Sequence, residues 1–399
     1  MRHQTLGRNT VSDPKKVVGL IRDSNNRDPL QKVLMMENYS ISFCSNTKQC
    51  MELLDNIRPD FLIHEILATE ESQGRAMQLS LYKRDLTWRL IRILIVPTID
   101  DKAIAFASDA GIHKVIHSST SVLGIVSSLG QLKSSVLANE ALQAQLKQIR
   151  SGVKKYNQAE LDQMIRDSFA KYPNDQDIQI EHGGLLFRNG DLDNALNTAK
   201  SVIKVNPLNV RALNLIARIL AQKGELKESI EILKKANVLS PDNPDRLIQM
   251  GQTFFKDGNL AEAKKHFKVA YQIAPTDSEA IKGLGIIAIE EGDADSLGKL
   301  FANTLSEEET ASFFNNQAVY QAQNNNPQKA VEMYALAFRL LKTPTYKPQI
   351  LLNLSLCYQR LGNSKEAVMT LKQVLKIDPN YNKAKKILYV IESELKKSS

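Results

Sequence analysis

The sequence predicts a chain in two parts, an α/β domain followed by an all-helical solenoid. In the first 130 residues, short apolar runs alternate with amphipathic segments, which is the pattern of a parallel sheet covered by helices. Further on, glycines and prolines each recur every 34 residues, and an internal repeat of this length indicates a solenoid. The repeated positions are Gly190, Gly224, Gly258 and Gly292, and Pro173, Pro207, Pro241 and Pro275.

The composition fits a folded protein with more than one domain. The 399 residues are 43% hydrophobic and 24% charged, and a chain of this length usually exceeds one compact core. The formal net charge is +8, but the lysines are spread over many predicted helices, which favours a solvated surface over a nucleic-acid-binding patch. The three cysteines form no CxxC motif and no Cys/His cluster, so no zinc site is predicted.

The sequence contains no segment that predicts a membrane span or a signal peptide. No stretch reaches 18 apolar residues, the length that a spanning helix requires. Residues 1–14 are polar and lack the apolar core of a signal peptide, so we expect them to form a flexible N-terminus. These features predict a cytoplasmic protein.

The N-terminal part predicts five strands that alternate with helices. Short apolar runs that end at polar residues indicate buried strands, and Gly111 marks the end of the helix before the last strand. The helix after the first strand is expected to begin at Pro29, with Asp28 as its cap. We expect the strands at residues 17–21, 41–44, 60–65, 92–96 and 114–116, and the helices at residues 29–36, 48–57, 102–110 and from about 121 onwards.

Residues 15–130 resemble the receiver domain of bacterial response regulators, which has a CheY-like, flavodoxin-like fold. The run from Pro59 to Glu65 is similar to the third strand of that family, and Asp109-Ala110-Gly111 precedes the fifth strand as it does there. The resemblance implies a five-stranded parallel sheet with a phosphate-accepting aspartate at the end of strand three. It also implies two magnesium-binding acids, a Thr or Ser, and a Lys at the carboxyl ends of neighbouring strands.

The residues at these positions predict a pseudo-receiver that is not phosphorylated. The acceptor position holds Glu65, whose longer side chain disturbs the in-line geometry. The acid pair after strand one is Arg22 and Asp23, and the cation opposes magnesium binding, although it is able to pair with the glutamate instead. Thr98 fits the strand-four position, whereas Ser118 stands where the family has its lysine.

From residue 175 onwards the repeated unit resembles the tetratricopeptide repeat. We expect about six repeats over residues 175–380, of which Leu247 to Pro275 matches the family pattern most fully. Later units drift, because Asn325 stands at a turn glycine position and Leu297 stands where a small residue is usual. The matching positions of the best unit are Leu247, Gly251, Phe254, Gly258, Ala263, Phe267, Ala270 and Pro275.

Both ends of the array are predicted to be capped. Residues 131–174 are expected to form a linker and capping helices, and residues 381–399 a C-terminal capping helix. Leu142 with Leu146, and Leu161 with Ile165, are spaced for one apolar helix face. Caps are expected because a terminal repeat exposes the face that a neighbour would otherwise cover.

The resemblance implies that the first helix of each repeat lines a concave groove. Apolar side chains mixed with amides and a few cations suit a bound peptide, with apolar anchors for affinity and amides for its backbone. Only Asn214 and Arg218 hint at the clamp with which some tetratricopeptide proteins bind chaperone C-termini, so that clamp is not predicted. The expected groove residues are Asn214, Arg218, Ile248, Gln252, Phe255, Lys282, Ile286, Asn315, Val319, Leu352, Leu356 and Arg360.

The sequence therefore predicts a non-enzymatic scaffold or regulator in bacterial signalling. No cofactor is expected, because GxxxxGK[ST], HExxH, GxSxG and GxGxxG motifs are absent. His64, His113 and His117 are not expected to bind a metal, since strand alternation divides their side chains between two faces. A partner protein or peptide is expected in the groove, and a second partner, or the array itself, on the receiver-like domain.

Two alternatives stay open. The first is a phosphorylatable response regulator of a two-component system, with the repeat array as its output domain. The second is a basic regulator that binds nucleic acid. The net charge of +8 allows the second alternative, but a single Trp88 beside Arg84 and Arg89 supports it only weakly.

Overall fold

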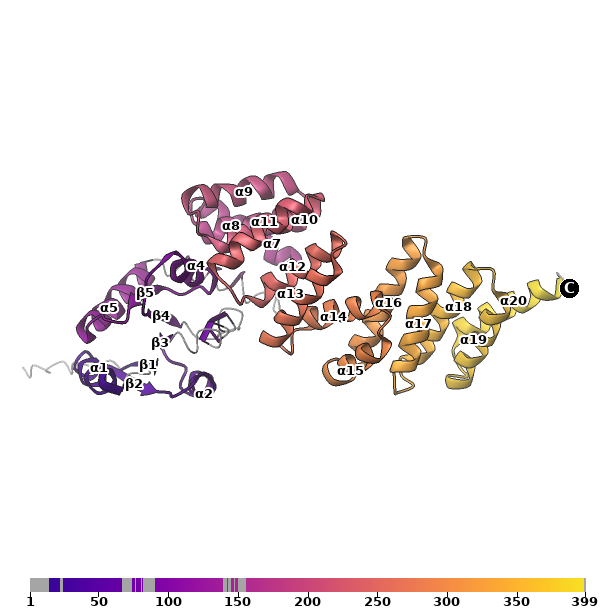
Figure 1. Ribbon diagram of the computed structural model, residues 1–399, viewed down its shortest axis with the longest axis horizontal. Coiled ribbons are helices and arrows are strands. Elements are labelled where there is room, and N and C mark those ends of the chain that lie inside the picture. The colour runs from indigo at the N-terminus through magenta and orange to yellow at the C-terminus, as the bar shows by residue number, and fades with distance from the viewer. Residues whose placement is uncertain are drawn as a thin grey trace, which may run out of the picture. The chain divides into compact units, whose positions relative to one another are not determined.

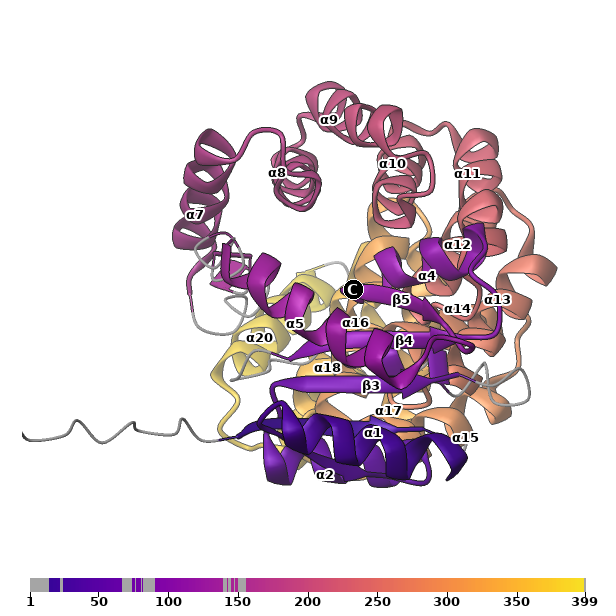
Figure 2. The same ribbon diagram turned by 90° about the vertical axis from the view of Figure 1, so that its left-hand side faces the viewer.

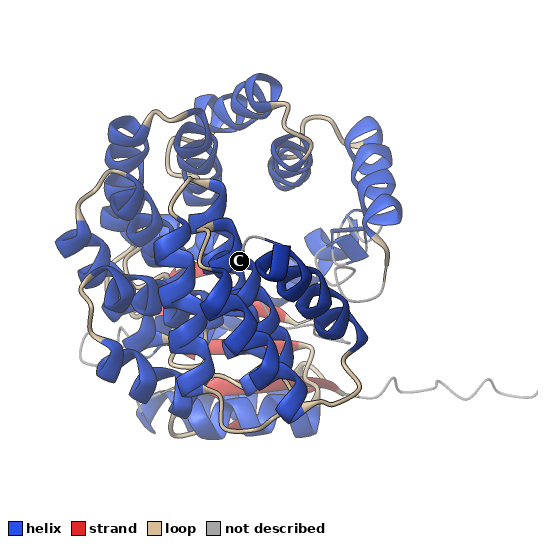
Figure 3. Ribbon diagram, turned by 90° about the vertical axis from the view of Figure 1, so that its right-hand side faces the viewer, coloured by secondary structure: helices blue, strands red, loops and turns tan. Residues whose placement is uncertain are grey.

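The computed structural model contains two compact units, residues 1–258 and residues 259–399 (Figure 1). Strands occur only in the N-terminal part of the described chain, and the rest is helical (Figure 3). No helix in the described part is both long and apolar enough to cross a lipid bilayer. The structure describes residues 14–21, 24–66, 74–75, 77–79, 81, 90–138, 142, 145–146, 148–149 and 156–397.

The strands of the first unit form one parallel sheet in the order β2-β1-β3-β4-β5 (Figure 1). Figure 2 shows β3, β4 and β5 of this sheet side by side. Neighbouring strands are in register, so that Val17 of β1 pairs with Phe61 of β3 and Glu65 of β3 pairs with Ile95 of β4. The two interior strands β3 and β4 are almost fully buried, as a parallel sheet between helical layers requires. The strands are β1 (Lys15–Leu20), β2 (Tyr39–Phe43), β3 (Phe61–Glu65), β4 (Ile91–Val96) and β5 (Lys114–His117).

Helices cover both faces of this sheet. On one face, Leu30 and Leu34 of α1 and Ile125 of α5 pack against β1, β3 and β4. On the other face, Leu54 of α2 and Phe106 of α4 fill the space. The helices are α1 (Ser24–Met36), α2 (Thr47–Ile57), α4 (Asp101–Asp109) and α5 (Val122–Ala138). We call residues 15–130 the receiver-like domain.

The helix after β1 starts earlier than predicted. It begins at Ser24 instead of Pro29, so Asp28 lies inside α1 and the prediction that it caps the helix is wrong. The proline removes one backbone donor near the start of the helix, and a single lost hydrogen bond does not stop the helix from forming upstream. Arg27 Nε donates to the carbonyl oxygen of Ile21 at 2.8 Å, which ties the first turns of α1 to the end of β1.

Helices of the array in the first unit begin at capping residues that the sequence period marks. Pro207 and Pro241 each stand two residues before an asparagine, and Asn209 and Asn243 accept hydrogen bonds from backbone N–H groups of the helices that they open. The proline spacing therefore records where one helix ends and the next is capped. The helices of this part of the first unit are α7 (Gln158–Lys171), α8 (Gln176–Arg188), α9 (Leu192–Val205), α10 (Val210–Lys223), α11 (Leu226–Leu239) and α12 (Pro244–Lys256).

The glycines of the 34-residue period occupy tight turns between helices. Gly190 and Gly224 have φ angles of 81° and 85°, in the left-handed region that glycine adopts without a Cβ clash. In the drifted repeat, Asn325 takes the same conformation with a φ of 61°. Asparagine is one of the few other residues that tolerate it, which explains why this substitution keeps the turn.

Apolar side chains between residues 142 and 165 pack against helix α8. Leu142 and Leu146 are buried on one face, as their spacing predicted, and they pack in one cluster with Leu161, Ile165 and Ile178. Nearby, the ring of His182 stacks on Phe169 with a centroid distance of 3.9 Å. Burial, followed by the charge of Arg166, lowers the pKa of His182 and so favours its neutral form.

The second unit contains only helices in its described residues. Leu297, at a position where a small residue is usual, is fully buried beside Phe301. Gly285 on the preceding helix leaves space for Leu297 and for the ring of Phe301. On the same helix, the ring of Phe267 packs against Gly283. The helices are α13 (Leu260–Ile273), α14 (Ser278–Glu290), α15 (Ala294–Thr304), α16 (Glu307–Gln323), α17 (Pro327–Leu340), α18 (Lys347–Arg360), α19 (Ser364–Ile377) and α20 (Asn382–Lys397). The predicted fold class, a five-stranded parallel sheet joined to an α-solenoid, is confirmed.

Candidate functional site

The carboxyl edge of the sheet gathers three of the five residues predicted for the degenerate phosphoacceptor site. Glu65 is the last residue of β3, Thr98 follows the end of β4 by two residues, and Ser118 directly follows β5. The backbone N–H of Ser118 donates to the carbonyl oxygen of Val96 at 2.8 Å, which keeps the ends of β4 and β5 together. The other two residues, Arg22 and Asp23, lie outside the described residues.

The lysine of β5 does not lie at the carboxyl end of this strand. Lys114 is the lysine of this strand, but it lies at the opposite, amino end, where its Nζ donates to Gln131 of α5 at 3.1 Å. At the carboxyl end, His117 Nδ1 and Ser119 Oγ lie 2.7 Å apart and bond to each other. The carboxyl end of β5 therefore presents hydroxyl and imidazole groups.

A buried polar group lies on the other side of β3 from Glu65. His64 Nδ1 bonds to Gln78 Nε2 at 2.9 Å, and Arg92 Nη1 donates to the carbonyl oxygen of Gln78 at 3.0 Å. Arg92 Nη2 also donates to the carbonyl oxygen of Gly111 at 2.8 Å. These side chains are buried and hydrogen-bonded, which is the ordinary condition for polar groups inside a fold. No group of three or more His, Cys, Asp or Glu in the described part of the chain is placed to hold a metal ion.

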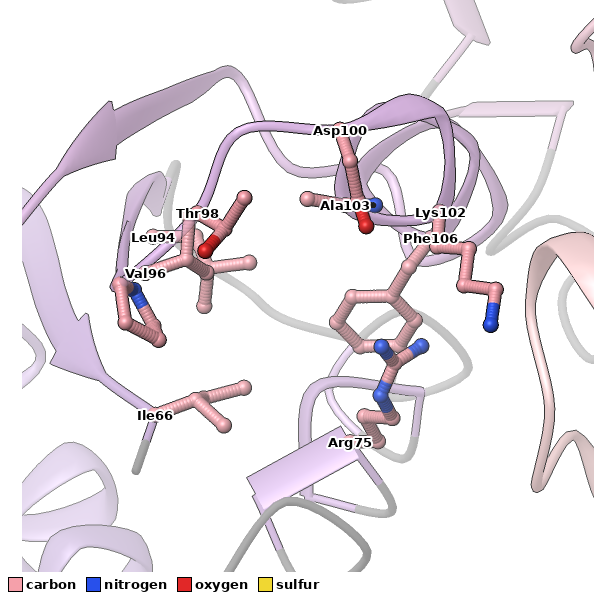
Figure 4. Close-up of a pocket in the computed structure, with 10 residues that line it drawn as sticks. Ile66, Arg75, Leu94, Val96, Thr98, Asp100, Lys102, Ala103 and Phe106 are labelled. Atoms are coloured by element: carbon pink, nitrogen blue, oxygen red, sulfur yellow. Dashed lines mark hydrogen bonds between the residues drawn. The ribbon is translucent and has the colours of Figure 1, made fainter. Parts of the chain in front are cut away.

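A small cavity of about 290 Å³ opens beside Thr98, between the end of β4 and the start of α4 (Figure 4). Its floor is apolar and includes Phe106, and Arg75 lies over the Phe106 ring with its Cζ 4.6 Å from the centroid. Asp100 also lines it, but its carboxylate accepts the backbone N–H of Ala103 at 2.8 Å as the cap of α4. Glu65 is not among the lining residues, so this cavity does not unite the predicted site.

In the first unit, the predicted groove positions are partly open. Arg218 and Gln252 are exposed, whereas Asn214 and Phe255 are half-buried. The Arg218 guanidinium lies over the ring of Phe187, with its Cζ 4.9 Å from the centroid. Asn214 Oδ1 is buried and accepts no hydrogen bond from the described residues, so this position has unused hydrogen-bonding capacity.

In the second unit, the predicted groove positions differ in their exposure. Lys282, Ile286, Asn315 and Leu356 are half-buried, while Val319 and Arg360 are exposed. The amine of Lys282 pairs with Glu279 at 2.9 Å on the surface of α14. Two further positions in the sequence analysis, Ile248 of the first unit and Leu352 of the second, are buried and present no surface.

A chain of polar side chains in the second unit was not foreseen from the sequence. Asn315 Oδ1 accepts from Tyr334 Oη at 3.0 Å and from Asn353 Nδ2 at 2.9 Å. Asn353 Oδ1 accepts from Gln349 Nε2 at 3.0 Å, and Gln349 Oε1 accepts from Tyr381 Oη at 2.6 Å. We call these five residues the polar ladder.

The polar ladder fixes the orientation of its amides. Because the oxygen of Asn315 already accepts two hydrogen bonds, its amide nitrogen is the atom that remains to donate. Burial, and then the nearby Cys357, raise the pKa of Tyr334 to about 12, so its hydroxyl stays protonated and donates at neutral pH. The one local sequence signal was the i, i+4 spacing of Gln349 and Asn353 on one helix face.

Comparisons with known proteins agree on the helical array. The family model described as "Tetratricopeptide repeat" matches residues 180–244, and a second model with the same description matches residues 348–381. No curated protein sequence matches the chain significantly.

Several solved structures are similar to this chain at low identity, with TM-scores below 0.5. A tetratricopeptide repeat protein from Parabacteroides merdae ATCC 43184 is 15% identical, covering 63% of this chain and 99% of that chain, with a TM-score of 0.39. The Cut9–Hcn1 hetero-tetramer of the APC/C is 15% identical over 86% of this chain and 58% of that chain, with a TM-score of 0.44. YrrB, titled a TPR protein with an unusual peptide-binding site, is 16% identical over 56% and 96%, with a TM-score of 0.31. On the two family-model matches, the helical part of this chain contains tetratricopeptide repeats at residues 180–244 and 348–381.

Proposed function

We propose that this protein is a non-enzymatic interaction scaffold in bacterial signalling, in which a pseudo-receiver domain is joined to a peptide-binding repeat array. The observation that carries the proposal is the combination of an altered acidic site with groove positions that keep amides, cations and apolar side chains accessible. We place the modules at residues 15–130, 131–174, 175–380 and 381–399. A cytoplasmic location is part of the proposal, supported by three buried cysteine thiols.

The repeat array is proposed to bind an extended segment of a partner protein. Val319 and Arg360 offer an exposed apolar surface and an exposed cation, and the amide nitrogen of Asn315 supplies a donor with a fixed direction. Apolar anchors give affinity, while amides match the repeating donors and acceptors of a peptide backbone. A partner with a hydrophobic side chain beside an acidic one fits this chemistry.

A pair of exposed valines tests this groove. We expect peptides selected from a displayed random library on the full chain to bind Val319→Asp at least about tenfold more weakly than the native protein, because an apolar anchor is lost. Val238→Asp is the matched control, since Val238 is also exposed but lies on α11, the second helix of its repeat. Binding by isothermal calorimetry gives the answer. Equal affinity of the selected peptides for both variants would place the site elsewhere.

The receiver-like domain is proposed to lack phosphoryl chemistry. Glu65 stands at the acceptor position, Arg22 replaces one of two acids, and Ser118 replaces the lysine. Magnesium needs a near-octahedral set of oxygen ligands, and the loss of one carboxylate to a cation removes both a ligand and charge compensation. The alternative, a phosphorylatable response regulator, requires these three changes to be tolerated together.

Phosphate analogues separate the two functions. Beryllofluoride or acetyl phosphate with Mg²⁺ is expected to leave the NMR spectrum of the full chain unchanged, since neither the metal site nor the lysine contact is complete. We expect Glu65→Asp to stay unresponsive for the same reason. A phosphorylatable receiver domain serves as the positive control. A magnesium-dependent change in the native spectrum would instead favour the response regulator.

A further inference from the structure

The carboxylate of Asp109, at the last residue of α4, is buried against residues of the repeat array. Only 4% of its surface is exposed. Asp109 Oδ2 accepts three hydrogen bonds, from Ser240 Oγ at 2.9 Å, from Asn243 Nδ2 at 2.9 Å and from Arg246 Nη1 at 3.1 Å. These donors lie 131 to 137 residues further along the chain, inside the same compact unit. The contact therefore joins the receiver-like domain to the array.

The three donors come from the end of α11 and the start of α12. Ser240 is the C-cap of α11, and Asn243 is the N-cap of α12. Asn243 Oδ1 accepts from the backbone N–H groups of Asp245 and Arg246, which turns its amide nitrogen outward to Asp109. Arg246 is fully buried. The turn between α11 and α12, together with the first turn of α12, thus directs three donors at one carboxylate oxygen, and one of these donors is a guanidinium.

Apolar side chains complete the docking site around α4. Ala105, near the middle of α4, is fully buried in one cluster with Val210 and Leu213 of α10 and Ala236 of α11. An alanine on α4 allows the close approach of these helices. Small and apolar contacts along the helix, and a carboxylate bound at its C-terminal end, together fix both its position and its direction.

We propose that α10, α11 and the start of α12 form a docking site for a helix whose last residue has a carboxylate side chain. Helix α4 of the same chain occupies this site. The buried ion pair of Asp109 and Arg246 then fixes the receiver-like domain on the first half of the array. We call this contact the latch. An occupied site keeps the α4 face away from other proteins, so a partner of the receiver-like domain binds another face. The latch depends neither on the peptide groove nor on the lost phosphorylation site.

We expect the latch to determine which surfaces dock together more than how tightly they dock. Burying two charges costs most of what their attraction returns, so the intact pair adds little compared with apolar residues. Removing one partner is different, because it leaves the other charge buried without compensation. A single neutral substitution should therefore open the latch, whereas neutralising both partners should largely preserve it.

A cleavable form of the full chain tests the proposal. A protease site is inserted between Ala138 and Leu142, the protein is purified uncut, and the fragments are examined by size-exclusion chromatography and fluorescence anisotropy after cleavage. We expect the native fragments to stay associated at micromolar concentration. Asp109→Asn and Arg246→Gln should each weaken association by about 100-fold. The double variant should bind at least about tenfold more tightly than either single variant.

Asp101→Asn is the matched control, because Asp101 is exposed at the first turn of the same helix. It should leave association unchanged. Circular dichroism of each uncut variant checks folding, and if Arg246→Gln unfolds α12, Asp109→Asn alone decides, since Asp109 lies outside the array. Native fragments that separate freely, or an Asp109→Asn effect no larger than that of the control, would refute the latch. Dimers that form through exchange of α4 between copies would refute its occupation in cis.

Discussion

Replacing Phe301 by alanine is expected to lower the free energy of unfolding of the second unit by about 3–5 kcal/mol. Phe301 is only 2% exposed. Its ring makes edge-to-face contacts with Phe313 at 4.9 Å and with Phe314 at 5.9 Å, and it packs against the backbone position of Gly285. Truncation removes buried apolar area and leaves a cavity that two rigid rings cannot close.

Urea unfolding monitored by hydrogen exchange and mass spectrometry assigns the lost free energy of unfolding to peptides from residues 259–399. Tyr389→Ala is the control, because Tyr389 is another large aromatic residue of this unit but is 76% exposed. Its effect should stay within about 0.5 kcal/mol. A loss below about 1 kcal/mol for Phe301→Ala would mean that the three aromatic rings do not form a tight core.

The sequence predicted the architecture because its signals are periodic and local. The positive φ angle of a tight turn is a local requirement that glycine meets, so Gly190 and Gly224 could be assigned to turns without knowledge of the rest of the fold. Apolar runs such as Ile91–Val96 are buried wherever a parallel sheet places them. The start of α1 was misplaced because Pro29 resembles a start signal, whereas the helix begins at Ser24 and its Arg27 bonds to the end of β1.

The candidate site could be predicted only in part. Helical spacing indicated a face for each groove position, but an error of one position turns a surface residue into a core residue, as the burial of Ile248 and Leu352 shows. The polar ladder connects residues of several helices through side-chain hydrogen bonds. No pattern within one helix encodes such a network.

The contact of Asp109 illustrates the same limit most clearly. The sequence analysis noted Asp109 only as a family-like feature before strand five. Its partner Arg246 is 137 residues away and lies in a different module. Local propensity and periodicity describe how each helix forms, whereas the docking of two modules depends on which side chains meet after both have folded.

Replacing Gly283 by alanine is expected to destabilise the second unit by about 2–3 kcal/mol, although alanine favours helices. A Cβ atom at this position of α14 would lie 2.4 Å from Cδ1 and Cε1 of Phe267. That ring is 2% exposed on α13, so moving it would disturb the packing around it. The steric cost therefore exceeds the gain in helix propensity, which is about 1 kcal/mol.

Two comparisons make the Gly283 prediction specific. Gly184→Ala on α8 is the control, because its Cβ would approach only the tip of Arg188 at 3.9 Å, and it should stabilise the protein by about 0.5–1 kcal/mol. In a double-mutant cycle, Phe267→Leu should cost less in the Gly283→Ala background than alone, since the smaller side chain relieves the clash. Urea unfolding of the four proteins measures the coupling. Additive effects would show that the methyl group and the ring do not compete for the same space.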